Sequence, residues 1–352
     1  MNYGRRMIYT DATEITAANV ADEVRKAVMV HESNRADADN LNGYFCGKTK
    51  ILDKKKEIRE EINHKINENH AHEVTRFYEG YVFGEPIQYV RRENTAGDEG
   101  DDAIAADINA LNAYNSDAGK AACDARLANW ILKAGVGYRM TLPNKAWTPD
   151  GDEAPFKKYS LDPRQTFVVR TNDVERRVIM SVYYVRQTEN NEQVFSVYTD
   201  KSLFVVREFG GVEEYPHVLS MNPIVEYPLD ESRLGIFEVA VPLFDAIDEL
   251  QSNRMDDVVQ FVNSFLAIMG AQLDEETYAK LNAWKTLCLP EGSDAKYLSP
   301  AMNQNDVQTL KDDITQAIFE ICGIPNRSGG ASTSDNGVAV LLRDGYTAAE
   351  AR

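Results

Sequence analysis

No stretch of this 352-residue sequence is apolar for long enough to cross a lipid bilayer. A membrane-spanning helix needs about 20 apolar residues, whereas the longest candidate, residues 258–269, is interrupted by Gln260, Asn263 and Ser264. Residues 1–30 also lack the apolar centre and the small-residue cleavage site of a secretory signal. We therefore expect a soluble chain that avoids the secretory route and has no membrane partner.

Cysteine is scarce, and basic side chains are outnumbered by acidic ones. The four cysteines, Cys46, Cys123, Cys288 and Cys322, form no C-x-x-C pair, which predicts reduced thiols without a disulfide or a zinc site. Asp and Glu total 56 against 38 Lys and Arg, so the formal net charge is -18. This excess disfavours non-specific adhesion to phosphate backbones and excludes a basic nucleic-acid-binding protein.

Catalytic and metal-binding motifs are missing as well. The sequence has no G-x-x-x-x-G-K-[ST], G-x-G-x-x-G, G-x-S-x-G or H-E-x-x-H. The adjacent carboxylates at 256–257 and 312–313 diverge by about 100° on a helix, so we interpret them as solvated helix surface. His70 and His72 point to different faces of a predicted helix and are unsuited to sharing a metal. We therefore predict no catalytic residue, no metal and no cofactor.

What the sequence does contain is enough apolar material, 43% of residues, for one large or two ordinary domains. Apolar positions recur at helical spacing in residues 16–34, 58–81, 104–111 and 127–134, with a glycine-containing break at 42–47. The period then changes to two, and predicts an antiparallel meander with strands at 166–170, 178–186, 193–199 and 203–209. The fold class is therefore α+β.

Helical spacing returns after Pro228. It predicts one long helix over residues 243–269 and a second over 306–322, separated by a compact insert with short strands around Leu287 and Tyr297. Residues 327–337 have no apolar side chain larger than alanine, which predicts a mobile, solvated loop. A last predicted helix from Val338 still continues at Arg352, so we expect that a C-terminal portion is missing from this sequence.

The second long helix is predicted to carry a polar stripe. Its polar side chains recur at i+3 and i+4, about 100° around the helix from its apolar stripe. The stripe consists of Asp306, Thr309, Asp313, Gln316 and Glu320. In an isolated chain, we would interpret it as ordinary solvated surface.

Four short sequence segments, taken in their order along the chain, point to a known protein family. They are Tyr-Phe-Cys-Gly-Lys at 44–48, Gly-Tyr-Val-Phe-Gly-Glu-Pro-Ile at 80–87, Leu-Gly-Ile-Phe-Glu-Val at 234–239 leading into 243–253, and Gly-Ile-Pro at 323–325 followed by Ser-Asp-Asn-Gly-Val-Ala at 334–339. Together they resemble the portal proteins of tailed bacteriophages, in the subfamily typical of phages of Gram-positive hosts. The resemblance extends from about Leu41 to the end. Asp248 stands where this family often has Asn, and Asn336 replaces the usual Ser.

The resemblance implies a portal fold. In this fold residues 1–227 form the wing, 235–269 and 304–322 the two stem helices, 271–300 the clip, 326–337 the tunnel loop, and 338–352 the start of a wing or crown helix, with the crown itself absent. It also implies a non-enzymatic homo-oligomeric ring, a dodecamer, at the capsid portal vertex of the virion, assembled in the host cytoplasm. Double-stranded DNA would pass through the ring during packaging and ejection.

The resemblance also assigns expected roles to individual residues. Asp306, Thr309, Asp313, Gln316 and Glu320 would line the channel, where carboxylates repel phosphate and keep DNA from sticking. The tunnel-loop residues expected to touch DNA are Arg327, Ser328, Gly329, Gly330, Ser332, Thr333 and Ser334. The clip residues expected to dock the motor or an adaptor are Tyr278, Trp284 and Lys285.

The implied partners are the terminase large subunit, the scaffold and major capsid proteins, and a head-completion or adaptor protein. Some alternatives stay open. Trp284 is equally suited to the core of the clip itself, and the loop to a disordered connector. The whole chain could instead be an acidic hydrolase that uses Asp256 or Asp312, or a portal-like virion component that does not transport DNA.

Overall fold

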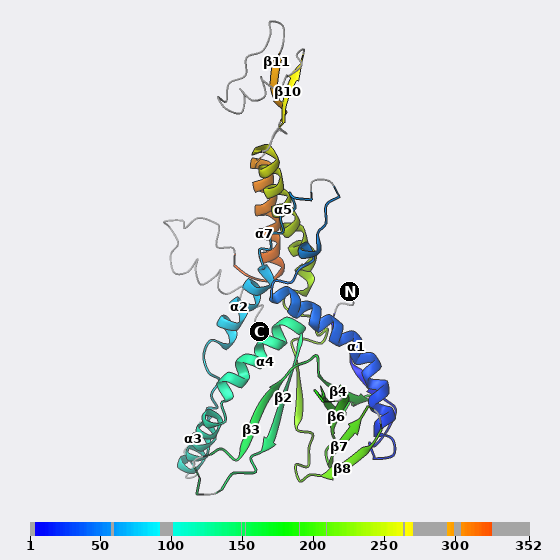
Figure 1. The fold of residues 1–352 in the computed structure, drawn as a ribbon. Helices are drawn as coiled ribbons and strands as arrows, with labels where there is room; N and C mark the ends of the chain where they lie inside the picture. The colour runs from blue at the N-terminus through cyan, green and yellow to red at the C-terminus, as the bar shows by residue number, and fades with distance from the viewer. Residues whose placement is uncertain are drawn as a thin grey trace. The chain divides into compact units, whose positions relative to one another are not determined.

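The computed structural model in Figure 1 describes residues 4–57, 60–91, 101–262 except 149, 152, 190 and 209, then 265–269, 294–298 and 304–325. The chain divides into two compact units. Unit 1 comprises Met1–Lys48, Asn69–Pro242 and Ile318–Arg352, and unit 2 comprises Thr49–Glu68 and Leu243–Ala317. Helices and mainly antiparallel strands occur in separate stretches of the chain, which confirms the α+β class.

The described residues of unit 1 form two sheets. The larger has six strands in the order β1 (Ile8–Thr10), β4 (Thr166–Thr171), β5 (Val178–Arg186), β6 (Gln193–Tyr198), β7 (Ser202–Arg207) and β8 (Val212–Pro216). The smaller has the order β3 (Phe156–Leu161), β2 (Val136–Pro143) and β9 (Ile224–Pro228). The predicted meander is confirmed as β4 to β7. The parallel pairing of β1 with β4 was not predicted, because the three residues of β1 form a ladder only with a strand far along the chain.

Helix α1 (Val20–Phe45) covers the larger sheet. Val20, Val24 and Ala27 pack in one core with strand residues that include Phe167 and Met180. The predicted helix over 16–34 is too short, because the buried face of α1 continues through Ala38, Leu41 and Tyr44. The chain leaves the helix only at Gly47, whose φ of 79 suits glycine, while Lys48 N donates to Gly43 O at 2.8 Å.

The described residues of unit 1 form three more α-helices: α2 (His70–Phe83), α3 (Asp101–Asp117) and α4 (Lys120–Ala134). The predicted helices around 104–111 and 127–134 are confirmed as α3 and α4. The predicted helix over 58–81 is wrong in its first half. Helix α2 begins only at His70, after Asn69, whose side chain accepts a hydrogen bond from His72 N at 3.2 Å.

Unit 2 contains the short 3-10 turn η1 (Lys50–Asp53), helix α5 (Val241–Val262, which begins in unit 1), strands β10 (Phe265–Met269) and β11 (Asp294–Leu298), and helix α7 (Gln304–Ile321, which ends in unit 1). Helices α5 and α7 run side by side (Figure 1), and Arg254 Nη1 donates to Gln308 Oε1 at 2.9 Å. The second long helix is thus confirmed. Among the described helices, none is long and apolar enough to span a bilayer.

The predicted continuation of the first long helix to Met269 is wrong. Helix α5 ends at Val262, and Phe265–Met269 forms β10, which pairs antiparallel with β11 so that Phe265 lies opposite Leu298. A short apolar run suits a strand as well as a helix, and here a distant strand supplies the partner. The strand expected around Tyr297 is confirmed as β11, whereas Leu287 lies outside the described residues.

Candidate functional site

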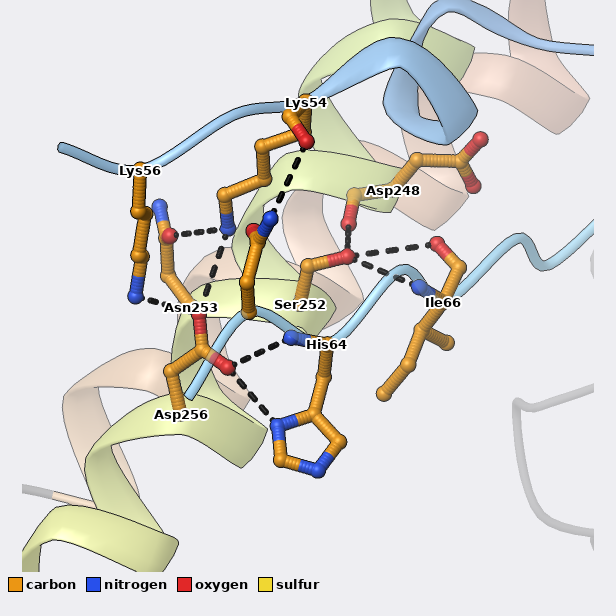
Figure 2. Close-up of polar contacts among 9 residues, drawn as sticks. Lys54, Lys56, His64, Ile66, Asp248, Ser252, Asn253 and Asp256 are labelled. Atoms are coloured by element: carbon orange, nitrogen blue, oxygen red, sulfur yellow. Dashed lines mark hydrogen bonds and ion pairs between the residues drawn. The ribbon is translucent and has the colours of Figure 1, made fainter. Parts of the chain in front are cut away.

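Three buried side chains on α5 bind an extended segment of the same unit. Figure 2 shows two of these contacts, those of Ser252 with Ile66 and of Asp256 with His64. Asp248, Ser252 and Asp256 are at most 2% exposed and recur every four residues. The backbone N–H of Glu68 donates to Asp248 Oδ1 at 3.0 Å, that of Ile66 to Ser252 Oγ at 2.9 Å, and that of His64 to Asp256 Oδ1 at 2.8 Å. We call these three side chains the α5 ladder.

The ladder works because two different repeats have nearly the same length. Four residues of a helix rise about 6 Å, and two residues of an extended chain rise about 6.6 Å. Every second N–H of the segment can therefore meet every fourth side chain of α5. Since these N–H groups are satisfied by side chains of another element, the segment gains little by forming the helix that was predicted for it.

The end of the ladder at Asp256 carries charge. Asp256 Oδ2 accepts from Lys56 Nζ and lies 3.4 Å from Lys54 Nζ, and His64 Nδ1 lies 2.8 Å from Oδ1 (Figure 2). Burial by itself raises the pKa of this carboxyl, but the hydrogen bonds from Lys56 and His64 outweigh it and hold the pKa well below its ordinary value. The interpretation of Asp256 as solvated surface is therefore wrong, although the adjacent Asp257 is exposed.

The other end of the ladder connects α5, the segment and α7. Asp248 Oδ2 accepts from Thr49 Oγ1 at 2.8 Å. Glu68 Oε1 accepts from both Gln251 Nε2 on α5 and Lys311 Nζ on α7, the latter at 2.6 Å. Sequence reasoning missed this set, because Thr49 and Asp248 lie 199 residues apart. The four-residue spacing of Asp248, Ser252 and Asp256 was the one available signal.

The acidic residues of the two long helices therefore differ in what surrounds them. On α5, Asp256 is paired with lysines, and Asp245 forms an ion pair with Lys50. On α7, the five residues of the predicted polar stripe are all exposed: Asp306, Thr309, Asp313, Gln316 and Glu320. The stripe on α7 is thus open to solvent, whereas Asp256 on α5 is buried.

The apolar stripe of α7 is covered only in part. Ile318 is fully buried, but Leu310 is 49% exposed and Ile321 is 52% exposed. Helix α7 ends in a glycine cap like that of α1. Gly323 has a φ of 64, and Ile324 N donates to Phe319 O at 2.8 Å. The Gly-Ile-Pro segment thus terminates the helix and turns the chain.

The Gly-Ile-Phe-Glu segment before α5 is held within unit 1. A Cβ atom at Gly235 would lie 2.2 Å from Lys133 O, so only glycine fits. Phe237 is fully buried, and the buried Glu238 pairs with Arg5 at 2.5 Å while Oε2 accepts from Gly235 N at 2.9 Å. Each of the three residues that this segment shares with the portal pattern is therefore fixed by packing or charge.

The remaining predicted sites divide into residues that the structure describes and residues that it does not. Asp256 is buried, and both of its oxygens accept hydrogen bonds, Oδ2 from Lys56 and Oδ1 from His64 N. Asp312 is exposed and accepts from Gln308 at 2.8 Å. Within the described ranges no three His, Cys, Asp or Glu side chains group as metal ligands. The clip residues Tyr278, Trp284 and Lys285 and the loop residues Arg327, Ser328, Gly329, Gly330, Ser332, Thr333 and Ser334 lie outside those ranges.

Comparisons with known proteins bear on the whole chain. A sequence profile of the family described as "Phage portal protein, SPP1 Gp6-like" matches residues 27–348. The chain is similar to a solved chain in the neck of an empty GTA particle computed with C6 symmetry, with 16% identity, a TM-score of 0.45, and coverage of 77% of this chain and 71% of that one. A comparison with curated proteins finds no match.

Two further solved structures are similar to the same degree. They come from the neck of a native GTA particle computed with C12 symmetry and from the virion of a native gene transfer agent (GTA) particle. Each shows 15% identity and a TM-score of 0.45, and covers 84% of this chain and 72% of that one. The family profile spans nearly the full sequence, and it alone carries the assignment. The chain belongs to the SPP1 Gp6-like family of phage portal proteins, which are structural components of the virion.

Proposed function

We propose that identical copies of this chain close into a ring, a dodecamer, at the capsid vertex and conduct double-stranded DNA during packaging and ejection. The observation that carries the proposal is the exposed polar stripe of α7 in a chain that belongs to the portal family. In the ring, the stripe faces the central hole. The chain itself is not an enzyme, and a terminase supplies the energy for DNA movement.

The charge of the stripe suits a conduit. DNA carries one negative charge per about 1.7 Å of its axis, and exposed charges act over a Debye length of about 8 Å at physiological salt. Each copy contributes Asp306, Asp313 and Glu320, which lie one above another along α7. Repetition around a ring converts them into anionic belts that repel phosphate, so that DNA slides without binding.

The α5 ladder supports the same proposal from within the subunit. A channel wall must keep its shape while a polymer is forced past it. The ladder ties α5 to residues 64–68, and Lys311 ties α7 to the same segment through Glu68. Lys50 and Lys56, which precede this segment, pair with Asp245 and Asp256 and so neutralise two of the α5 carboxylates.

The portal domains follow from the same proposal. We assign residues 1–227 to the wing, α5 and α7 to the stem, β10 and β11 with the insert between them to the clip, and 326–337 to the tunnel loop. The clip docks the terminase large subunit and later a head-completion or adaptor protein, through Tyr278, Trp284 and Lys285. The wing meets the scaffold and major capsid proteins. Arg327 and its small polar neighbours touch DNA transiently.

The mass of the purified full-length protein tests this proposal. We expect sedimentation or native mass measurement to give a particle near twelve times the chain mass of 39.5 kDa. The particle should hydrolyse no ATP by itself. A protein that stays monomeric at every concentration and in virion extracts would rule the ring out.

A further inference from the structure

A hollow of about 580 Å³ lies in unit 1 between helices α2 and α4. Its lining combines the small residues Gly80, Ala125 and Ala128 with the aromatic rings of Phe83 and Trp130. We call it the α2–α4 hollow. Its volume falls within the range of about 300–1,000 Å³ in which proteins enclose small ligands, so it has room for two apolar side chains.

Gly80 leaves this space unfilled. It lies within α2, where glycine is less favourable than alanine because it loses more backbone freedom on folding. Beyond the adjacent backbone of its own helix, a Cβ atom at Gly80 would meet nothing within 4 Å. At Gly84, by contrast, a Cβ atom would lie 2.4 Å from Gly80 O. Packing within the chain thus explains Gly84 but not Gly80, which indicates that another surface uses the space.

The turn between β8 and β9, residues 217–222, presents large apolar side chains to solvent. Val218 is 92% exposed and Met221 is 67% exposed. The turn is nonetheless held in place, because His217 N donates to Lys201 O at 2.9 Å and His217 Nδ1 accepts from Leu219 N at 3.3 Å. An apolar surface that is already held in one conformation loses little freedom when a partner covers it.

Charges of opposite sign accompany the two surfaces. Arg126 borders the hollow and is exposed, and among the described residues it forms no ion pair. Arg76 also borders the hollow, but it pairs with Glu79 at 2.9 Å. Glu214 on β8 is exposed and accepts from the neutral hydroxyl of Ser202 at 2.8 Å, without an ion pair in the described part of the chain. The two surfaces are therefore complementary in charge as well as in polarity.

We propose that Val218 and Met221 of one copy pack into the α2–α4 hollow of the next copy, with Glu214 facing Arg126. Helix α2 lies on the left of unit 1 and β8 on the right (Figure 1), so one copy can use both surfaces at once. A contact between two different surfaces repeats from copy to copy, and it closes into a ring when the rotation between copies permits. The inference rests on the ring proposed above and names a contact that closes it.

Cross-linking of the full-length protein tests this contact. The background carries Cys46→Ser and Cys288→Ser, because Cys46 is exposed and Cys288 lies outside the described residues. Gly80→Cys and Val218→Cys are combined in this background and treated with a short bismaleimide. We expect a ladder of covalent multimers roughly tenfold stronger than with either single variant, because the contact holds the two thiols at a high effective concentration.

Gly80→Cys combined with Val174→Cys is the matched control. Val174 is fully exposed in the turn between β4 and β5, so this pair offers as many accessible thiols, and we expect no ladder. Charge exchange gives a second measurement. Arg126→Glu should weaken the ladder of the Gly80 and Val218 pair several-fold, and the further change Glu214→Arg should restore it, because the ion pair is rebuilt with its charges exchanged.

The outcomes distinguish the contact from the ring. A wild-type protein that stays monomeric in the mass measurement removes the ring and this contact with it. A ring of the expected mass without a ladder above the Val174 control overturns the contact alone. Protection of the Gly80→Cys thiol from maleimide in chains that remain monomeric would show that the chain itself fills the hollow, and would also overturn the proposal.

Discussion

Replacing Asp256 with asparagine should destabilise unit 2 by about 3 kcal/mol, because it leaves Lys54 and Lys56 near a neutral group in a largely buried position. The loss should appear as faster hydrogen exchange of residues 60–68, whose amides at His64 and Ile66 are held by α5. A free-energy change of 1.36 kcal/mol corresponds to a tenfold change in an equilibrium constant, so the exchange rate of these amides should rise roughly 100-fold. Exchange measured by mass spectrometry on the assembled protein gives this quantity directly.

Asp257→Asn is the matched control for this prediction. It removes the same charge from the adjacent residue of α5, but Asp257 is exposed, so we expect a change within about 0.5 kcal/mol. Acidification provides a second check. Because the pKa of Asp256 in the folded protein lies below its ordinary value of 3.8, its stabilisation is present above about pH 4 and is lost as the pH falls. The difference in unfolding free energy between the wild-type protein and Asp256→Asn should therefore become smaller as the pH falls. A difference that stays constant down to pH 2 would contradict the account.

Reversal of charge on the α7 stripe should impair DNA packaging by at least tenfold. The variant carries Asp306→Lys, Asp313→Lys and Glu320→Lys. Each copy thus has three positive charges in place of three negative ones at exposed positions. Lysines repeated around a ring bind DNA phosphates and release counterions, which converts a repelling wall into one that holds the polymer. Packaged DNA per particle, measured by nuclease protection, reports the effect, and raised salt should restore part of it.

A control variant has the same change of charge elsewhere. Glu175→Lys, Glu189→Lys and Asp200→Lys lie at exposed turns of unit 1, and we expect this variant to package DNA normally. Both variants should assemble to the same mass, which separates a transport defect from an assembly defect. Normal packaging by the stripe variant would show that these three residues do not line a working channel, and would favour a portal-like component that does not transport DNA.

The strands were predictable because their signal is local. The run of β-branched and aromatic residues at 178–186 located β5 to the residue. The polar stripe of α7 was equally readable, since i+3 and i+4 spacing depends on the helix alone. That all five side chains are exposed agrees with the pattern, while their position on a channel wall stays a prediction.

The segment before α2 could not be predicted from its own sequence. Ile62 and Ile66 are four residues apart, and an even spacing places two side chains on one face of an extended chain as well as of a helix. The choice between the two is made by α5, whose ladder residues lie 180 residues or more along the chain. The same distance hid the role of Asp256, because the lysines that surround it lie at positions 54 and 56.

An electron-microscopic reconstruction of the purified full-length protein tests the central claim most directly. The account predicts a closed ring of identical subunits around a central hole, with α7 on the inner wall and Asp306, Asp313 and Glu320 directed into the hole. A ring in which these three carboxylates face away from the hole, or particles without a hole, would contradict it.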